Sequence, residues 1–96
     1  MVLKTTRWDP AEYLDSPESI AAYLEAAFDE GDPSLIAAAL GDIARAKGMA
    51  QVARDAGLSR ESLYKALSGE RNPDFDTILR VVEALGLKLH AAPART

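Results

Sequence analysis

The chain has 96 residues and a formal net charge of −4, which fits one small domain or a small domain with an extension. It contains no cysteine, and this excludes disulfides and thiolate sites. It has no apolar run long enough to cross a bilayer and no signal-peptide core near its N-terminus. We therefore expect a cytoplasmic protein with no membrane partner.

The charge is distributed unevenly along the chain. Residues 1–46 hold three basic and nine acidic side chains (net −6), whereas residues 47–96 hold eight basic and six acidic ones (net +2). Such asymmetry suggests two partners of opposite charge, although the acidic total argues against a simple DNA-binding protein. We divide the chain into an acidic helical extension (1–46) that contributes to the core and to partner binding, a mildly basic region (47–90) and a flexible tail (91–96).

The N-terminal half contains three helix-start signals, each a capping residue followed by proline. Asp9–Pro10 predicts a short helical turn, while Ser16–Pro17 and Asp32–Pro33 predict longer helices that end near Gly31 and Gly48. The acidic residues of this half could form a binding patch or simply a solvated helix face; they are Glu18, Glu25, Asp29, Glu30 and Asp32.

Residues 49–67 have the pattern of a helix-turn-helix. Gly57 can adopt the left-handed conformation that stops one helix, and Ser59 can cap the next. Ala53 is small enough for two helices to cross closely, and Leu63 lies on the inward side of the second helix. An ordinary αα-hairpin would explain Ala53, Gly57 and Leu63 equally well. It would not explain why the second helix carries polar and basic residues on its outer side.

The loop after this second helix has its own signals. Gly69 ends the helix and Pro73 stiffens the loop. Arg71 and Asn72 would lie beside whatever the second helix contacts, and they suit phosphate contact. A simple chain reversal would look similar, but it would not need Arg71.

A final helix follows, capped by Asp74 or Asp76 and ended by Gly86. Its predicted apolar stripe consists of Phe75, Ile78, Leu79, Val82 and Leu85. The alternation of apolar and polar residues over 87–90 is consistent with a short strand. Such a strand needs a partner, either residues 2–6 or the same strand of a second copy.

Nothing in the sequence points to catalysis. His90 is the sole histidine, so a transition-metal site and a Ser-His-Asp arrangement lack their residues. The glycines do not form a phosphate-binding loop, and the carboxylates lie on predicted exposed faces with no apolar pocket to raise a pKa. We expect no enzyme activity, no cofactor and no metal.

Residues 49–85 resemble the DNA-binding domain of Xre/Cro-type phage repressors. The resemblance rests on Ala53, Gly57–Ser59, Leu63 and the following helix with Ile78, Val82 and Leu85. Over nearly the whole chain the sequence resembles the addiction-module antidote proteins, which are HigA-like antitoxins. Three blocks carry this closer match: Trp8–Leu14, Glu30–Pro33 before an Ala-rich helix, and Gly57–Ser68 continuing to Asn72–Pro73 and Leu85–Leu87.

This resemblance implies an all-α fold of five to six short helices. It would comprise a lambda-repressor-like helix-turn-helix domain and an N-terminal helical extension. The alternation over residues 87–90 adds a candidate short C-terminal strand. The resemblance also implies one half of a type II toxin–antitoxin module, which binds a small basic RelE/ParE-like toxin and represses its own operon as a homodimer on double-stranded operator DNA. The DNA-binding region (47–90) is only weakly basic, unlike a protein that binds DNA tightly as a monomer. Because phosphate contacts dominate the affinity for DNA, a dimer would be needed. Residues 87–90 and the first helices are both candidates for the dimer interface.

The residues expected to contact DNA lie on or near the second helix of the helix-turn-helix. Arg60 would read a guanine edge or a phosphate, and Glu61 would accept from cytosine or orient Arg60. Tyr64 and Lys65 would contact bases or backbone farther along the groove. The full set is Gln51, Ser59, Arg60, Glu61, Ser62, Tyr64, Lys65, Arg71 and Asn72.

Two alternatives to the antitoxin remain. A free-standing Xre-family repressor would use the acidic half only for its core and dimer interface. A protein-interaction module would retain a degenerate helix-turn-helix, with the negative charge as its binding feature.

Overall fold

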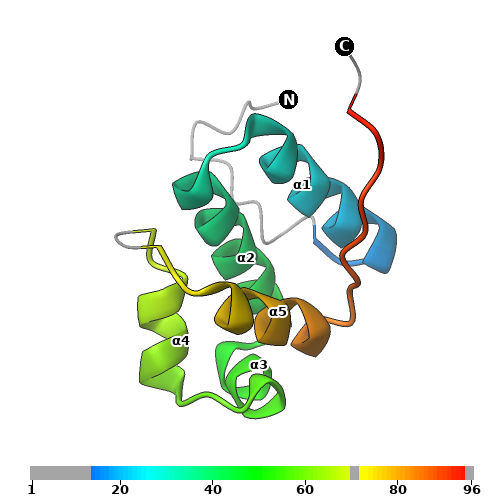
Figure 1. The fold of residues 1–96 in the computed structure, drawn as a ribbon. Helices are drawn as coiled ribbons and strands as arrows, with labels where there is room; N and C mark the ends of the chain where they lie inside the picture. The colour runs from blue at the N-terminus through cyan, green and yellow to red at the C-terminus, as the bar shows by residue number, and fades with distance from the viewer. Residues whose placement is uncertain (1–13, 70–71, 95–96) are drawn as a thin grey trace, which may run out of the picture.

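The computed structural model describes residues 14–69 and 72–94, and within them the chain forms five α-helices and no strand. α1 lies at one end of the molecule and α3 and α4 lie at the other; α2 runs between the two ends, and α5 packs against α3 (Figure 1). In the described chain no helix has the length and apolar character needed to cross a membrane. The helices are α1 (Pro17–Glu30), α2 (Pro33–Lys47), α3 (Met49–Ala56), α4 (Arg60–Ala66) and α5 (Phe75–Ala84).

The starts of α1 and α2 follow the predicted signals. The Ser16 hydroxyl accepts a hydrogen bond from the Ser19 amide at 3.1 Å, and the Ser19 side chain accepts one from the Ser16 amide in return. This reciprocal pair satisfies two amides that would otherwise lack partners at the helix start. Asp32 caps α2 through the Ser34 amide at 3.0 Å. The predicted turn at Asp9–Pro10 and the candidate strand at residues 2–6 lie outside the described residues.

One cluster of buried apolar residues joins all five helices. α2 packs on α1 and α3, and α3 also packs on α4 and α5. Burial of each large apolar side chain contributes about 1.5–3 kcal/mol, so this cluster is the main source of stability. The largest completely buried side chains are Leu40, Ile43, Val52, Leu63, Val81 and Val82.

The core-facing side of α5 differs from the predicted stripe. Phe75 is 66% exposed, whereas Val81, which the stripe omitted, is completely buried. Burial increases along the helix, from exposed Phe75 through half-buried Ile78 and Leu79 to buried Val81 and Val82. The reason is that only the second half of α5 lies fully in the core, so a periodic pattern over the whole helix misassigns its first residue.

Residues 87–94 form neither helix nor strand in this single chain. Leu87 and Leu89 are half-buried against the core, while Lys88 and His90 are exposed. The predicted alternation therefore reflects packing of a single extended segment. The short C-terminal strand is not formed, because a strand needs a hydrogen-bonding partner and the described chain supplies none here.

Candidate nucleic-acid interface

The turn between α3 and α4 is built around Gly57. Gly57 has φ 74° and ψ 30°, the left-handed conformation that glycine adopts without steric cost. Its amide donates to the Arg54 carbonyl at 3.2 Å, and the Leu58 amide donates to the Ala53 carbonyl at 2.9 Å. These bonds satisfy carbonyls at the end of α3, as in other helices that end at glycine. The predicted role of Gly57 is confirmed.

Ser59 then starts α4. Its backbone is extended, and its hydroxyl accepts a hydrogen bond from the Ser62 amide at 3.0 Å. The two hydroxyl oxygens of Ser59 and Ser62 also lie within hydrogen-bond distance, at 2.9 Å. The cap is as predicted. Both residues, named earlier as candidates for DNA contact, use their hydroxyls to form the start of the helix.

The two sides of α4 have opposite character. Leu63 is completely buried, and Leu67 just after the helix is 7% exposed. Ala53 of α3, only 3% exposed, lies in the same core. The other side of α4 consists of exposed residues that we call the α4 outer face: Arg60, Glu61, Ser62, Tyr64 and Lys65.

Within the α4 outer face, Arg60 and Tyr64 lie one helical turn apart and interact. The guanidinium carbon of Arg60 is 5.9 Å from the centre of the Tyr64 ring. A cation over an aromatic face at an exposed site is worth about 0.5–1 kcal/mol. Tyr64 is still 50% exposed, so the pair presents a planar guanidinium and a phenol to solvent. Both groups can bind phosphates or base edges.

Gln51 takes part in a small network on the surface of α3. Its side-chain nitrogen Nε2 donates to Asp55 Oδ1 at 2.9 Å, and its oxygen Oε1 accepts from Arg54 Nη2 at 3.1 Å. Arg54 was not among the predicted site residues, although its spacing of three residues from Gln51 could have indicated it. Of the remaining candidates, Asn72 is exposed, and Arg71 lies outside the described residues.

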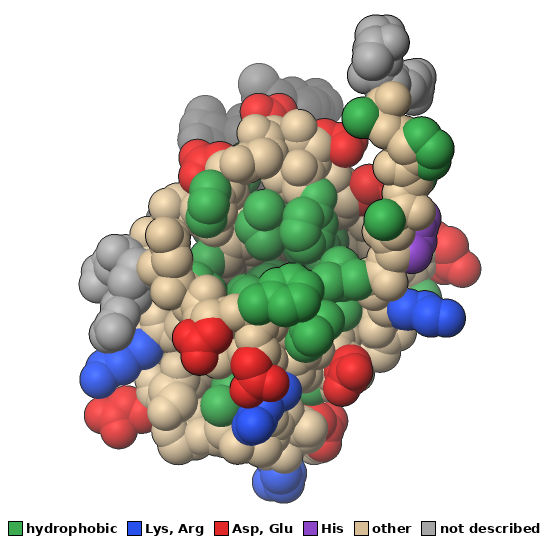
Figure 2. All heavy atoms as spheres, viewed as in Figure 1, with side chains coloured by type: hydrophobic (Ala, Val, Ile, Leu, Met, Phe, Trp, Pro, Cys, Tyr) green, Lys and Arg blue, Asp and Glu red, His purple; other side chains and the backbone are tan. Residues whose placement is uncertain are grey.

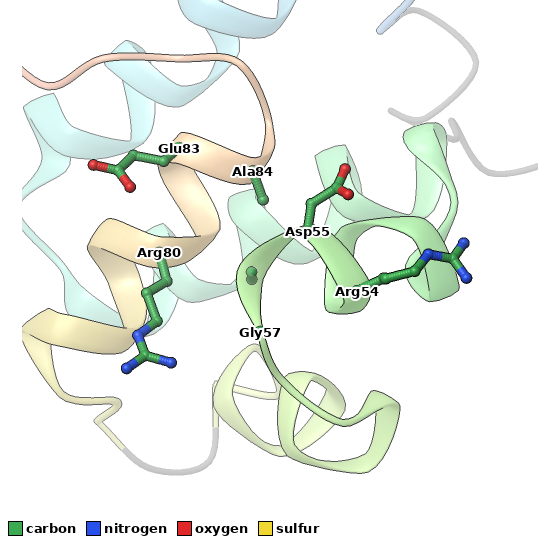
Figure 3. Close-up of a pocket in the computed structure, with 7 residues that line it drawn as sticks. Arg54, Asp55, Gly57, Arg80, Glu83 and Ala84 are labelled. Atoms are coloured by element: carbon green, nitrogen blue, oxygen red, sulfur yellow. The ribbon is translucent and has the colours of Figure 1, made fainter.

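A shallow surface hollow lies beside the Gly57 turn, between α3 and α5 (Figure 3). Arg80 of α5 reaches toward this turn, with its Nη1 atom 3.7 Å from the position that a Cβ on Gly57 would occupy. Arg54 and Arg80 extend in different directions, so they do not close on a common anion (Figure 3). Two acidic residues, Asp55 and Glu83, also line the hollow, and its mixed charges indicate no single ligand.

The acidic residues predicted to form a patch on the N-terminal half remain on the surface. The predicted patch residues Glu18, Glu25, Asp29, Glu30 and Asp32 are all exposed, and α1 itself contains no basic residue. Figure 2 shows acidic side chains around the end of the molecule that α1 forms. Among the described residues, no group of three or more histidine, aspartate or glutamate side chains is arranged to hold a metal ion.

Known proteins resemble this chain over nearly its whole length. The profile of a family described as "Probable addiction module antidote protein" matches residues 4–93. An uncharacterised protein of Haemophilus influenzae is 52% identical over 88 residues, which cover 92% of this chain and 91% of that protein. No solved structure matches the chain significantly. The similarity therefore includes α1 and α2 as well as the α3–turn–α4 unit.

Proposed function

This chain belongs to the family described as "probable addiction module antidote protein", and on that premise we propose that it is an antitoxin that also represses its own operon. In this proposal the chain binds a toxin and operator DNA and catalyses no reaction. The observation that carries the DNA-binding part is the α4 outer face. All five of its residues are exposed and polar or aromatic, while Leu63 anchors the opposite side in the core.

We interpret α3, the Gly57 turn and α4 as a helix-turn-helix whose second helix enters the major groove. That groove is about 12 Å wide and accommodates one α-helix. Arg60, near the start of α4, would donate to a guanine edge or a phosphate, and Glu61 would accept from cytosine or orient Arg60. Tyr64 and Lys65 would contact bases or backbone farther along the groove. Gln51, together with Asn72, would contact phosphates.

The charge of the α3–turn–α4 unit supports binding as a dimer. Residues 49–66 contain three basic and two acidic side chains, a net charge of only +1. Phosphate contacts supply most of the affinity for DNA, so one copy of this unit would bind weakly. Two copies related by a two-fold axis would place their α4 helices about 34 Å apart and read a palindromic operator.

The acidic α1 surface supports a separate site for the toxin. Exposed carboxylates on a helix that contains no basic residue would attract a small basic protein of the RelE/ParE type. α1 and α4 lie at opposite ends of the molecule (Figure 1), so one chain could hold toxin and DNA together. A free-standing repressor would use the same α4 outer face but would have no use for this acidic surface.

The test is binding to a labelled duplex of the protein's own upstream region, over a series of salt concentrations. Arg60→Ala should weaken binding by about 1–3 kcal/mol, roughly 5- to 150-fold, if Arg60 makes a base contact. Lys65→Ala should weaken binding and, if Lys65 contacts a phosphate, lower the salt slope by about one. Lys88→Ala is the matched control, because it removes one exposed positive charge far along the chain from α4.

The same measurement is then repeated with the product of the neighbouring gene. Salt-sensitive, sequence-specific binding that responds to this product supports the antitoxin and autorepressor. Specific binding without any response indicates a free-standing repressor. If Arg60→Ala and Lys65→Ala bind DNA as the unsubstituted chain does, α4 does not read DNA and the proposal fails.

A further inference from the structure

The first half of α5 carries an exposed surface that neither the core nor the α4 outer face uses. Phe75 is 66% exposed and Leu79, one turn later, is half-buried. Beside them Asp76 and Arg80, also one turn apart, have side chains that are 71% and 48% exposed. We call these four residues the α5 outer face. Figure 2 shows apolar side chains along α5, with acidic and basic side chains directly beside them.

The α5 outer face is complementary to itself. Its apolar row, Phe75 and Leu79, and its charged row, Asp76 and Arg80, have the same four-residue spacing, and their midpoints fall at positions 77 and 78. If a second α5 lies antiparallel across these midpoints, each Phe75 meets the other Leu79. By the same rotation each Asp76 meets the other Arg80. A two-fold interface must have this reciprocal property, in which residue i contacts residue j and j contacts i.

We propose that the α5 outer face binds a second copy of this chain, with a two-fold axis near residues 77 and 78. The Asp76 Oδ2 and Arg80 Nε atoms of one copy are 3.3 Å apart, and in the pair these two charges become a network of four. Because α3 packs on both α4 and α5, a contact between two α5 helices also fixes the separation of the two α4 helices. That separation is what a palindromic operator reads.

Other surfaces fit a second copy less well. α1 carries exposed acidic residues and no basic one, so two α1 faces would repel each other. Leu87 and Leu89, expected earlier as interface candidates, are half-buried against the core of their own chain. The α5 outer face combines an exposed aromatic residue with balanced charges.

This inference rests on the proposed function only in the need for a dimer on DNA, so its test uses no DNA. The full chain is studied by sedimentation equilibrium at concentrations on the order of 1–100 µM. A dimer held by one helix face should be in measurable equilibrium with its monomer in this range. Phe75→Ser should weaken the dimer at least about tenfold. Phe28→Ser is the matched control, because it makes the same change at an exposed phenylalanine of α1. It should leave dimerisation unchanged, since Phe28 is not part of the α5 outer face.

Charge reversal tests the reciprocal pairing directly. Asp76→Arg leaves only positive charge on the charged row, and Arg80→Asp leaves only negative charge there. Each variant alone should dimerise more weakly than the unsubstituted chain, and a mixture of the two should form a heterodimer tighter than either homodimer.

A chain that stays monomeric throughout, a dimer unaffected by Phe75→Ser, or a mixture with no preference for the heterodimer overturns the inference. These results leave DNA binding by α4 untouched. Conversely, an intact dimer that does not bind the duplex would overturn the proposed function alone.

Discussion

Tyr23, Asp42 and Arg45 form a polar link between α1 and α2. The Tyr23 hydroxyl donates to Asp42 Oδ2 at 2.6 Å, and Asp42 Oδ1 accepts from Arg45. Burial, the hydrogen bond to Asp42 and the nearby Asp42 charge raise the pKa of Tyr23 from 10.0 to about 12. The protonated phenol is therefore the form that the folded chain stabilises, since a phenolate could not donate and would face a carboxylate.

Replacing Tyr23 with phenylalanine tests this link. Tyr23→Phe should lower the free energy of unfolding near neutral pH by about 1–2 kcal/mol, because the hydrogen bond to a charged acceptor is lost. The contribution of Tyr23 should be complete below pH 10 and should disappear as the pH rises toward about 12. Denaturant unfolding of both proteins from neutral to alkaline pH measures this.

Tyr64→Phe is the control for that experiment, because Tyr64 is half exposed on α4. Its effect on stability should stay within about 0.5 kcal/mol. If Tyr23→Phe unfolds with the same free energy and the same alkaline dependence as the unsubstituted chain, the Tyr23–Asp42 bond does not stabilise the fold.

Among the elements, the α3–turn–α4 unit depends most on a single backbone conformation. Gly57 has a positive φ of 74°, and the short loop leaves no other residue to reverse the chain before Ser59 starts α4. A Cβ at Gly57 would lie 3.7 Å from the Arg80 side chain, which is an ordinary contact. The cost of a larger residue here should therefore come from the backbone.

Two substitutions at Gly57 separate backbone strain from crowding. Gly57→Ala should destabilise the chain by about 1–2 kcal/mol, because alanine disfavours the left-handed region. Gly57→Asn should cost less although its side chain is larger, because asparagine tolerates this conformation. Chemical denaturation compares the two, and an asparagine variant less stable than the alanine variant would identify crowding as the cause.

In the whole molecule, one shared core joins two ends that differ in charge. Buried residues of all five helices belong to the same cluster, while the acidic α1 and the weakly basic α4 lie at opposite ends (Figure 1). α2 is central to this arrangement, because it packs on both α1 and α3. Damage to the buried side of α2 should therefore destabilise both ends together.

Two leucines of α2 provide a matched comparison. Leu40 is completely buried and Leu35 is 43% exposed. Leu40→Ala should lower the free energy of unfolding by about 2–5 kcal/mol, because it removes core contacts and leaves a cavity. Leu35→Ala makes the same chemical change in the same helix and should cost less than about 1 kcal/mol. Equal losses, measured by thermal or denaturant unfolding, would contradict the central position of Leu40.

The local features of this protein follow from neighbouring residues in its sequence. The starts of α1 and α2 at Ser16 and Asp32, the turn at Gly57 and the cap at Ser59 depend on residues within about four positions of each other. The composition of the α4 outer face follows from helical periodicity once Leu63 is placed inside. These features are predictable because short-range hydrogen bonds and backbone preferences decide them.

Which distant residues come into contact depends on the tertiary structure. It rotates α5 so that Val81 is buried and Phe75 is exposed, and it brings Arg80 beside Gly57. It also pairs Tyr23 with Asp42, nineteen residues away. These contacts depend on how whole helices pack against a common core, and several packings satisfy the same local pattern. Helical periodicity cannot choose among them, because it places a residue on one side of its own helix but does not say what lies opposite.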